Sequence, residues 1–261
     1  MFFDDEYLYS GKDIIALSFL CYAVLRERTD FGDFVIATDN PSVMLPLMFA
    51  GWLLGRNIIQ PNTLQAEGFR VFDPKKTLCV FGEKRIYDET CEYFTDNDAA
   101  SGKSLNADVS KPALKDLSVV FDAYRSACCE SVTGFSASVS AGNACRNGIH
   151  AFTAETAGIL RDILSGNDIT GVLNSLSGSF SGITGVNPEE FIAVLAGFMS
   201  DPLNETRLCI TGLTSGSTGL PKRVPRTLGD FYREIDCVSG FILPSYAENT
   251  LGAATVTNFH A

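Results

Sequence analysis

The sequence is poor in the side chains that bind transition metals. It holds only two histidines, His150 and His260, and its eight cysteines include no Cys-x-x-Cys pair. Structural zinc sites usually need such closely spaced ligands, and isolated cysteines in apolar runs act as small hydrophobic residues. We therefore expect no metal ligands from the protein itself. We also expect reduced thiols rather than disulfides, which favours a cytoplasmic location.

Other signatures are missing as well. The absence of a Gly-x-Ser-x-Gly elbow argues against a Ser-His-Asp hydrolase. The longest apolar stretch, residues 43–54, is shorter than the ~20 residues that span a bilayer, and it contains Pro46. The start, from Met1 to Glu6, lacks the basic residues and the long apolar core of a signal peptide. We expect a protein that does not insert into a membrane.

Basic residues are scarce too. The sequence has 20 lysines and arginines against 31 acidic residues, which leaves a net charge of -11. This balance argues against nucleic acid and against anionic membrane surfaces as partners. One segment departs from it, because no acidic residue occurs between Glu205 and Asp230. The basic residues in that interval are Arg207, Lys222, Arg223 and Arg226. A local excess of positive charge in an acidic protein indicates an anion site.

The same segment contains the most informative motif of the chain. Residues 214–224 read Thr-Ser-Gly-Ser-Thr-Gly-Leu-Pro-Lys-Arg-Val. Glycines let a backbone turn tightly around an anion, hydroxyl groups donate hydrogen bonds, and lysine adds a mobile positive charge. An apolar run at 208–210 precedes the motif, and a helix start at 227–230 follows it. We predict a strand, a phosphate-binding loop and then a helix. The loop is not of the Walker A type, since Lys222 follows proline rather than glycine.

The motif resembles the phosphate loop of the adenylate-forming (AMP-binding) superfamily, which includes acyl- and aryl-CoA synthetases, peptide-synthetase adenylation domains and luciferases. That loop reads Thr-Ser-Gly-Ser/Thr-Thr-Gly-x-Pro-Lys-Gly-Val, and residues 214–222 match it at every specified place. Arg223 differs, because most members have glycine there. The resemblance implies that Lys222 anchors the loop or neutralises phosphate charge. The residues implied to contact the nucleotide are Thr214, Ser215, Gly216, Ser217, Thr218, Gly219 and Lys222.

Two weaker similarities flank the motif. The order of helix, Gly-Asp, strand, Asn, helix, Ala-Gly and strand in the first third is similar to the same family, although it is also general α/β order. Phe259-His260 resembles the beginning of a family motif close to the acyl pocket, which would give His260 a place beside the acyl group. An ordinary histidine near a chain end is the alternative. The family's later adenine, ribose and hinge segments do not follow, so we expect an N-terminal fragment.

The resemblance implies an AMP-forming acid–thiol ligase. Such enzymes use ATP and Mg²⁺ to convert a carboxylic acid into an acyl-adenylate, and then pass the acyl group to a thiol. Coenzyme A or the phosphopantetheine of an acyl carrier protein would be the acceptor. The alternative is a non-catalytic nucleotide- or phosphate-binding remnant or scaffold, and we expect the fragment alone to be inactive.

The alternation of elements predicts an α/β fold with stacked, mostly parallel sheets and flanking helices. We expect a first α/β subdomain over 1–110 and a second over 111–261, which holds a Ser/Gly/Ala-rich segment and the phosphate loop. Strands are predicted at 34–37, 57–59, 78–81 and 208–210. Helices are predicted from Ser10, Asn40, Pro112 and Asn187, over 153–164, and from 228 to about 241. Residues 95–111 are predicted to be a polar loop.

Overall fold

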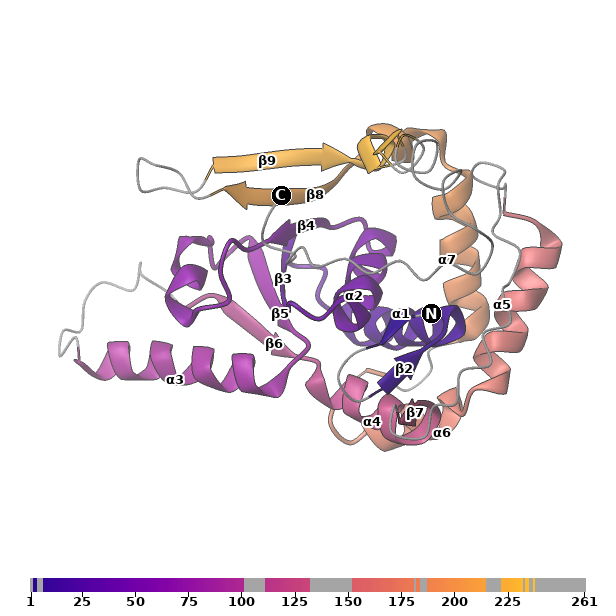
Figure 1. Ribbon diagram of the computed structural model, residues 1–261, viewed down its shortest axis with the longest axis horizontal. Helices are drawn as coiled ribbons and strands as arrows, with labels where there is room; N and C mark the ends of the chain where they lie inside the picture. The colour runs from indigo at the N-terminus through magenta and orange to yellow at the C-terminus, as the bar shows by residue number, and fades with distance from the viewer. Residues whose placement is uncertain are drawn as a thin grey trace.

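A six-stranded sheet forms the centre of the computed structural model, which describes residues 2–3, 7–100, 111–131, 152–180, 182–183, 187–214, 222–231, 233–234 and 237. Its strand order is β6-β5-β3-β4-β8-β9 (Figure 1). The first five are mutually parallel, and β9 pairs antiparallel to β8. A separate three-stranded antiparallel sheet has the order β1-β2-β7. The α/β class with a mostly parallel sheet is thereby confirmed.

The elements have the following bounds. The strands are β1 Phe2–Phe3, β2 Tyr7–Tyr9, β3 Asp33–Ala37, β4 Asn57–Gln60, β5 Thr77–Phe81, β6 Ala113–Asp116, β7 Glu130–Ser131, β8 Leu208–Thr214 and β9 Lys222–Thr227. The helices are α1 Gly11–Leu25, α2 Pro41–Leu53, α3 Lys84–Ala100, α4 Ser118–Cys128, α5 Ala154–Gly166, α6 Ile169–Leu176 and α7 Pro188–Ser200. Two 3-10 helices are η1 Ala66–Val71 and η3 Pro202–Thr206.

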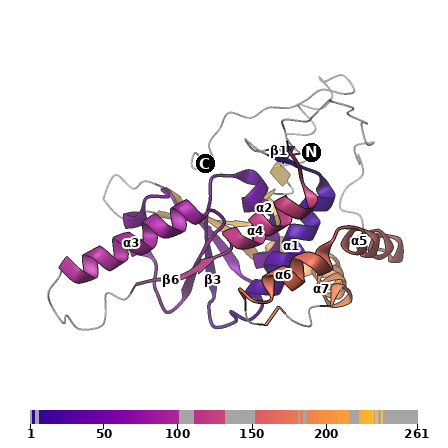
Figure 2. The same ribbon diagram turned by 90° about the horizontal axis from the view of Figure 1, so that it is seen from below.

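Helices cover both faces of the sheet, which is why its inner strands are apolar throughout rather than alternating. Phe34 and Ile36 of β3 point into the larger core, which α1, α2 and α4 share. Val35 and Ala37 point to the opposite face, where the buried side chains come from η1 and α3. Both views place α3 on one side of the strands and α1 on the other (Figures 1 and 2).

The predicted starts of three helices are confirmed, because each depends on a local capping group. Ser10 and Asp13 form a reciprocal capping box at α1, in which Asp13 N donates to Ser10 Oγ over 3.3 Å. Asn40 caps α2 and Asn187 caps α7, each followed by proline in the first turn. The helix predicted at 153–164 is α5, which Thr153 caps.

The prediction of a helix beginning at Pro112 is wrong. Residues Ala113–Asp116 form β6, which pairs in parallel with β5, and the helix begins only at Ser118. The apolar spacing of Leu117, Phe121 and Tyr124 is helical and all three are buried, but Leu114 belongs to the strand. Pairing with the edge of the sheet decides the state of this short segment, and helical periodicity cannot show that.

The predicted loop at 95–111 is wrong for its first part, since α3 continues to Ala100. The helix is polar but amphipathic, with Ile86, Thr90 and Phe94 buried. Salt bridges between residues four apart, such as Lys84 with Asp88 at 3.0 Å, support its exposed side. Strands from both sides of residue 110 lie in one sheet, and the division into subdomains stays a prediction. No helix in the described ranges combines the length and hydrophobicity needed to cross a bilayer.

Candidate functional site

The predicted phosphate motif lies at the turn of the β8–β9 hairpin. β8 leaves the sheet at Thr214, and the chain returns as β9 at Lys222, whose Cα is the register partner of Thr214. The Lys222 side chain is exposed. The hairpin thus brings the two ends of the motif side by side at the carboxyl end of a strand that is parallel to β4.

Most of the predicted nucleotide contacts belong to the segment between β8 and β9. Ser215, Gly216, Ser217, Thr218 and Gly219 lie outside the described residues, as does His260. Thr214 is described by its backbone alone, and Lys222 by backbone and side chain. The structure therefore brings Thr214 and Lys222 together and leaves the remaining residues of the prediction untested.

The expected strand–loop–helix order is wrong at one point, because strand β9 separates the loop from the next helix. That helix begins at Leu228, as predicted. Pro225 lies in β9. Because β9 is the outer strand of the sheet, it can contain a residue that has no backbone N–H to donate. The loop is therefore not followed directly by a helix N-terminus. An anion here would have to be held by backbone N–H groups, hydroxyls and lysine rather than by a helix dipole.

A chain of polar contacts joins the hairpin to the sheet. Thr211 Oγ1 donates to Asn57 Oδ1 over 3.2 Å, and Asn57 Nδ2 donates to Asp33 Oδ1 over 3.1 Å. Arg223 Nη1 of β9 lies 3.8 Å from Asp33 Oδ2. Arg223 is therefore engaged with the sheet rather than with the turn of the hairpin.

The other two arginines of this segment also form salt bridges with acidic side chains. Arg226 Nη2 pairs with Glu234 Oε2 at 2.6 Å, and its guanidinium lies 5.0 Å from the centre of the Phe231 ring. Arg207 Nη2 lies 3.5 Å from Asp201 Oδ2. The salt bridges of the described residues include all three arginines but not Lys222. Lys222 is thus the basic side chain of the segment that is placed to meet an external anion.

A second polar region, which the sequence analysis missed, lies where β3 and β5 end. Thr38 follows β3 and is buried, and its hydroxyl donates to Glu83 Oε1 over 2.5 Å. Asn40 N donates to Thr38 Oγ1 over 3.0 Å. The other oxygen, Glu83 Oε2, is buried and has no hydrogen-bond partner among the described residues. The available signal was a polar residue within two positions of the end of each of these buried strands, Thr38 after β3 and Glu83 after β5.

The carboxyl group of Glu83 has an unusual protonation equilibrium. Burial raises its pKa from 4.5 to about 7, and the negative charge of Asp39 adds to the increase. The hydrogen bond from Thr38 and the charges of Arg125 and Arg85 act in the opposite direction without cancelling the effect of burial. A carboxyl group that titrates near neutral pH at the end of a sheet is a candidate functional group.

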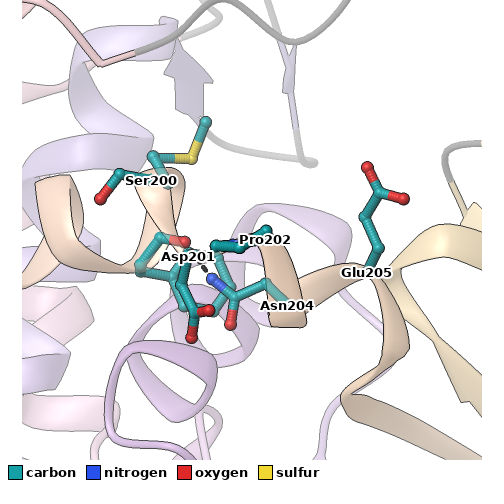
Figure 3. A pocket seen from close by; sticks show the side chains of 7 residues that line it. Ser200, Asp201, Pro202, Asn204 and Glu205 are labelled. Atoms are coloured by element: carbon teal, nitrogen blue, oxygen red, sulfur yellow. Dashed lines mark hydrogen bonds between the residues drawn. The ribbon is translucent and has the colours of Figure 1, made fainter.

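Two cavities lie elsewhere in the described part of the chain. One, of about 110 Å³, is enclosed by the end of α7 and by η3 (Figure 3). Two of its polar groups have structural roles: Asn204 Nδ2 donates to the carbonyl oxygen of Phe198, and Asp201 Oδ1 accepts from Leu203 N over 2.9 Å. Asn204 Oδ1 is buried and has no hydrogen-bond partner among the described residues. The Glu205 side chain lies apart from those of Asp201 and Asn204.

The other cavity, of about 410 Å³, lies among α5, α6 and the start of α7. At its edge Arg161 and Glu189 form a bidentate salt bridge. Arg161 Nε lies 2.6 Å from Glu189 Oε1, and Arg161 Nη2 lies 2.9 Å from Glu189 Oε2. Neither cavity is lined by a residue that the sequence predicted to bind a ligand. In the described ranges, no group of three or more His, Cys, Asp or Glu side chains could hold a metal ion.

Comparisons with models of protein families, with curated proteins and with solved structures found no match. The interpretation of residues 214–222 therefore depends on the motif and on the hairpin that presents it.

Proposed function

We propose that the loop between β8 and β9 binds the β- and γ-phosphates of ATP, and that this binding serves the activation of a carboxylic acid. The observation that carries the proposal is the match of residues 214–222 to the adenylate-forming phosphate loop. The hairpin supports it, because the register of Thr214 with Lys222 closes the loop at its two ends. A closed loop of this composition can surround an anion with donors.

The donor set fits a polyphosphate. Backbone N–H groups near Gly216 and Gly219 can approach phosphate oxygens closely, because neither residue carries a side chain. Ser215, Ser217 and Thr218 add hydroxyl donors, and Lys222 adds a positive charge. Mg²⁺ would arrive on the nucleotide, since it is usually held by phosphates with few protein ligands. Its contribution would be to neutralise phosphate charge.

In the proposed reaction an oxygen of the substrate carboxylate attacks the α-phosphorus of ATP. The bond between the α-phosphorus and the bridging oxygen breaks, and its electron pair leaves with pyrophosphate. Negative charge therefore grows on the group that the loop holds, and preorganised donors stabilise it. The acyl-adenylate would next react with a thiol, on coenzyme A or on a carrier-protein phosphopantetheine, to give a thioester and AMP.

A pair of lysine variants tests the phosphate site. We expect Lys222→Ala to weaken MgATP binding about tenfold or more, because a hydrogen bond from a charged donor is lost. Lys75→Ala is the matched control, since Lys75 is exposed and precedes β5, which β3 and β4 separate from β8. Isothermal titration calorimetry with MgATP measures both. Equal affinities of the two variants would contradict the assignment of the loop.

The chemical part of the proposal needs a separate measurement. Exchange of labelled pyrophosphate into ATP, dependent on an added carboxylic acid, reports formation of an acyl-adenylate. MgATP binding without exchange across a broad panel of acids would contradict the ligase function. It would favour the alternative of a nucleotide-binding module without chemistry.

A further inference from the structure

The strand order creates a point of divergence that the proposed ATP site does not use. From β3 the chain passes through α2 to β4 on one side, whereas from β5 it passes through α3 to β6 on the other. The connections therefore diverge between the carboxyl ends of β3 and β5, and open α/β sheets bind their ligands at such a divergence. We call this place the β3–β5 crevice and define it by Thr38, Asp39, Gly82 and Glu83.

Five buried side-chain atoms in the described part of the chain have no hydrogen-bond partner, and three of them are oxygens of residues that follow β3, β5 and β6 in the sequence. These three oxygens are Ser42 Oγ, Glu83 Oε2 and Ser118 Oγ. Ser42, in the first turn of α2, is only 1% exposed. Buried polar atoms normally have partners, so the unpartnered Glu83 Oε2 is the atom of this place that a ligand would satisfy.

The packing of the crevice leaves little room. A Cβ atom on Gly82 would lie 1.9 Å from Val43 Cγ1 in the first turn of α2. The end of β5 thus touches α2 directly, and the neighbouring Glu83 side chain, although partly exposed, has its Oε2 covered. A ligand here must be small, and it must reach Glu83 Oε2 while Thr38 keeps its hydrogen bond to Oε1.

The charge of the crevice favours a cation. Glu83 and the exposed Asp39 act on each other as like charges, and the arginines at positions 85 and 125 do not offset the cost of burying the Glu83 carboxylate. A buried carboxylate is stabilised by an opposite charge that also donates hydrogen bonds. A primary ammonium group supplies both, whereas an anion would be repelled.

We propose that the β3–β5 crevice binds a small ligand through its primary ammonium group, with Glu83 as the counter-ion and Thr38 as the residue that positions Glu83. This site is independent of the proposed phosphate loop, which follows β8 on the far side of β4. Binding would convert the neutral carboxyl group into a carboxylate and release a proton near neutral pH.

NMR titration of isotopically labelled glutamate carboxyl groups in the whole chain tests the proposal. The resonance that is missing in Glu83→Gln identifies Glu83. We expect methylammonium chloride to lower its titration midpoint by about one pH unit or more and to do so with saturation. Tetramethylammonium chloride is the matched control, because it carries the same charge without an N–H donor. Lys222→Ala should leave the response unchanged, which separates this site from the ATP site.

Three results would overturn the proposal. The first is a midpoint that methylammonium does not move. The second is an equal shift with tetramethylammonium or sodium chloride, which would show general charge screening. The third is a shift with magnesium chloride alone, which would assign the crevice to a metal ion. Thr38→Ser, which keeps the hydroxyl, should retain the response, and loss of it in this folded variant would also contradict the role of Thr38.

Discussion

The hairpin loop and the β3–β5 crevice both lie at carboxyl ends of strands in one sheet. They differ in the kind of evidence that identifies each of them. The loop carries a recognisable motif and ends in an exposed lysine, Lys222, on the outer strand β9. The crevice carries no motif, but it holds a carboxyl group, that of Glu83, with one buried and unpartnered oxygen. A site that uses many backbone and hydroxyl donors leaves a trace in sequence. A site that depends on one carboxyl group in an unusual environment is visible only in the fold.

The two regions should also differ in what they contribute to stability. The crevice lies against the core, where Phe81, Val43 and Thr38 are at most 1% exposed. In the hairpin, β8 pairs with β4, whereas β9 is the outer strand and makes partly exposed contacts such as that of Arg223 with Asp33. Changes in the crevice should therefore alter the free energy of unfolding, whereas changes in the hairpin should mainly alter binding. The following experiments test this contrast.

The largest expected effect is the pH dependence that Glu83 causes. Because its folded-state pKa is about 7 and its ordinary value is 4.5, the folded state holds a proton that the unfolded state loses between these values. The free energy of unfolding should therefore fall as the pH rises from 4.5 to 7. The loss attributable to Glu83 is at most about 3 kcal/mol. Urea unfolding of the wild type and of Glu83→Gln at several pH values measures the difference.

The same experiment has a clear contrary outcome. If both proteins lose the same stability over this pH range, Glu83 has an ordinary pKa and the crevice does not bury it. Thr38→Val should shift the Glu83 titration further upward, since the Thr38 hydrogen bond lowers the pKa. If Glu83 were simply exposed and did not contact Thr38, this substitution would leave the titration unchanged.

A smaller loss in the free energy of unfolding is expected from Gly82→Ala. The added methyl group would meet Val43 Cγ1 at 1.9 Å, and such overpacking costs about 1–3 kcal/mol. Gly158→Ala in α5 is the control, because no atom lies within 4 Å of its added Cβ and alanine favours a helix by about 1 kcal/mol. The midpoint temperature of thermal unfolding should thus fall for Gly82→Ala and rise for Gly158→Ala. An unchanged Gly82→Ala protein would mean that α2 and β5 are not in tight contact.

The smallest change in the free energy of unfolding is expected from Arg223→Ala on the hairpin. Its contact with Asp33 is 3.8 Å long and the arginine side chain is 54% exposed, and pairs of this kind contribute about 0–1 kcal/mol. Chemical denaturation should show a loss within that range. A much larger loss would remove the contrast, because it would show that the hairpin is as firmly integrated as the crevice.

Local signals in the sequence predicted the parts of the fold that depend on neighbouring residues. The capping box of Ser10 with Asp13, and the Asn-Pro starts of α2 and α7, are formed within one turn and were predicted correctly. Residues 113–116 and 222–227 form strands because a partner strand, β5 or β8, lies beside them. Their own residues do not decide this, which is why a helix start and a direct passage into a helix were predicted there.

The candidate sites divide in the same manner. The amino-acid sequence by itself determined the composition of the phosphate loop and the absence of acidic residues around it, because the order of residues 214–222 sets which donors a tight turn can offer. Only the tertiary structure decided that Thr214 faces Lys222 across a hairpin, and that Glu83 lies beside Thr38, which is 45 residues earlier in the sequence. The physical reason is that burial and charge act through space. The pKa of Glu83 depends mainly on burial, and Thr38, Asp39 and Arg125, which also act on it, come from distant parts of the sequence.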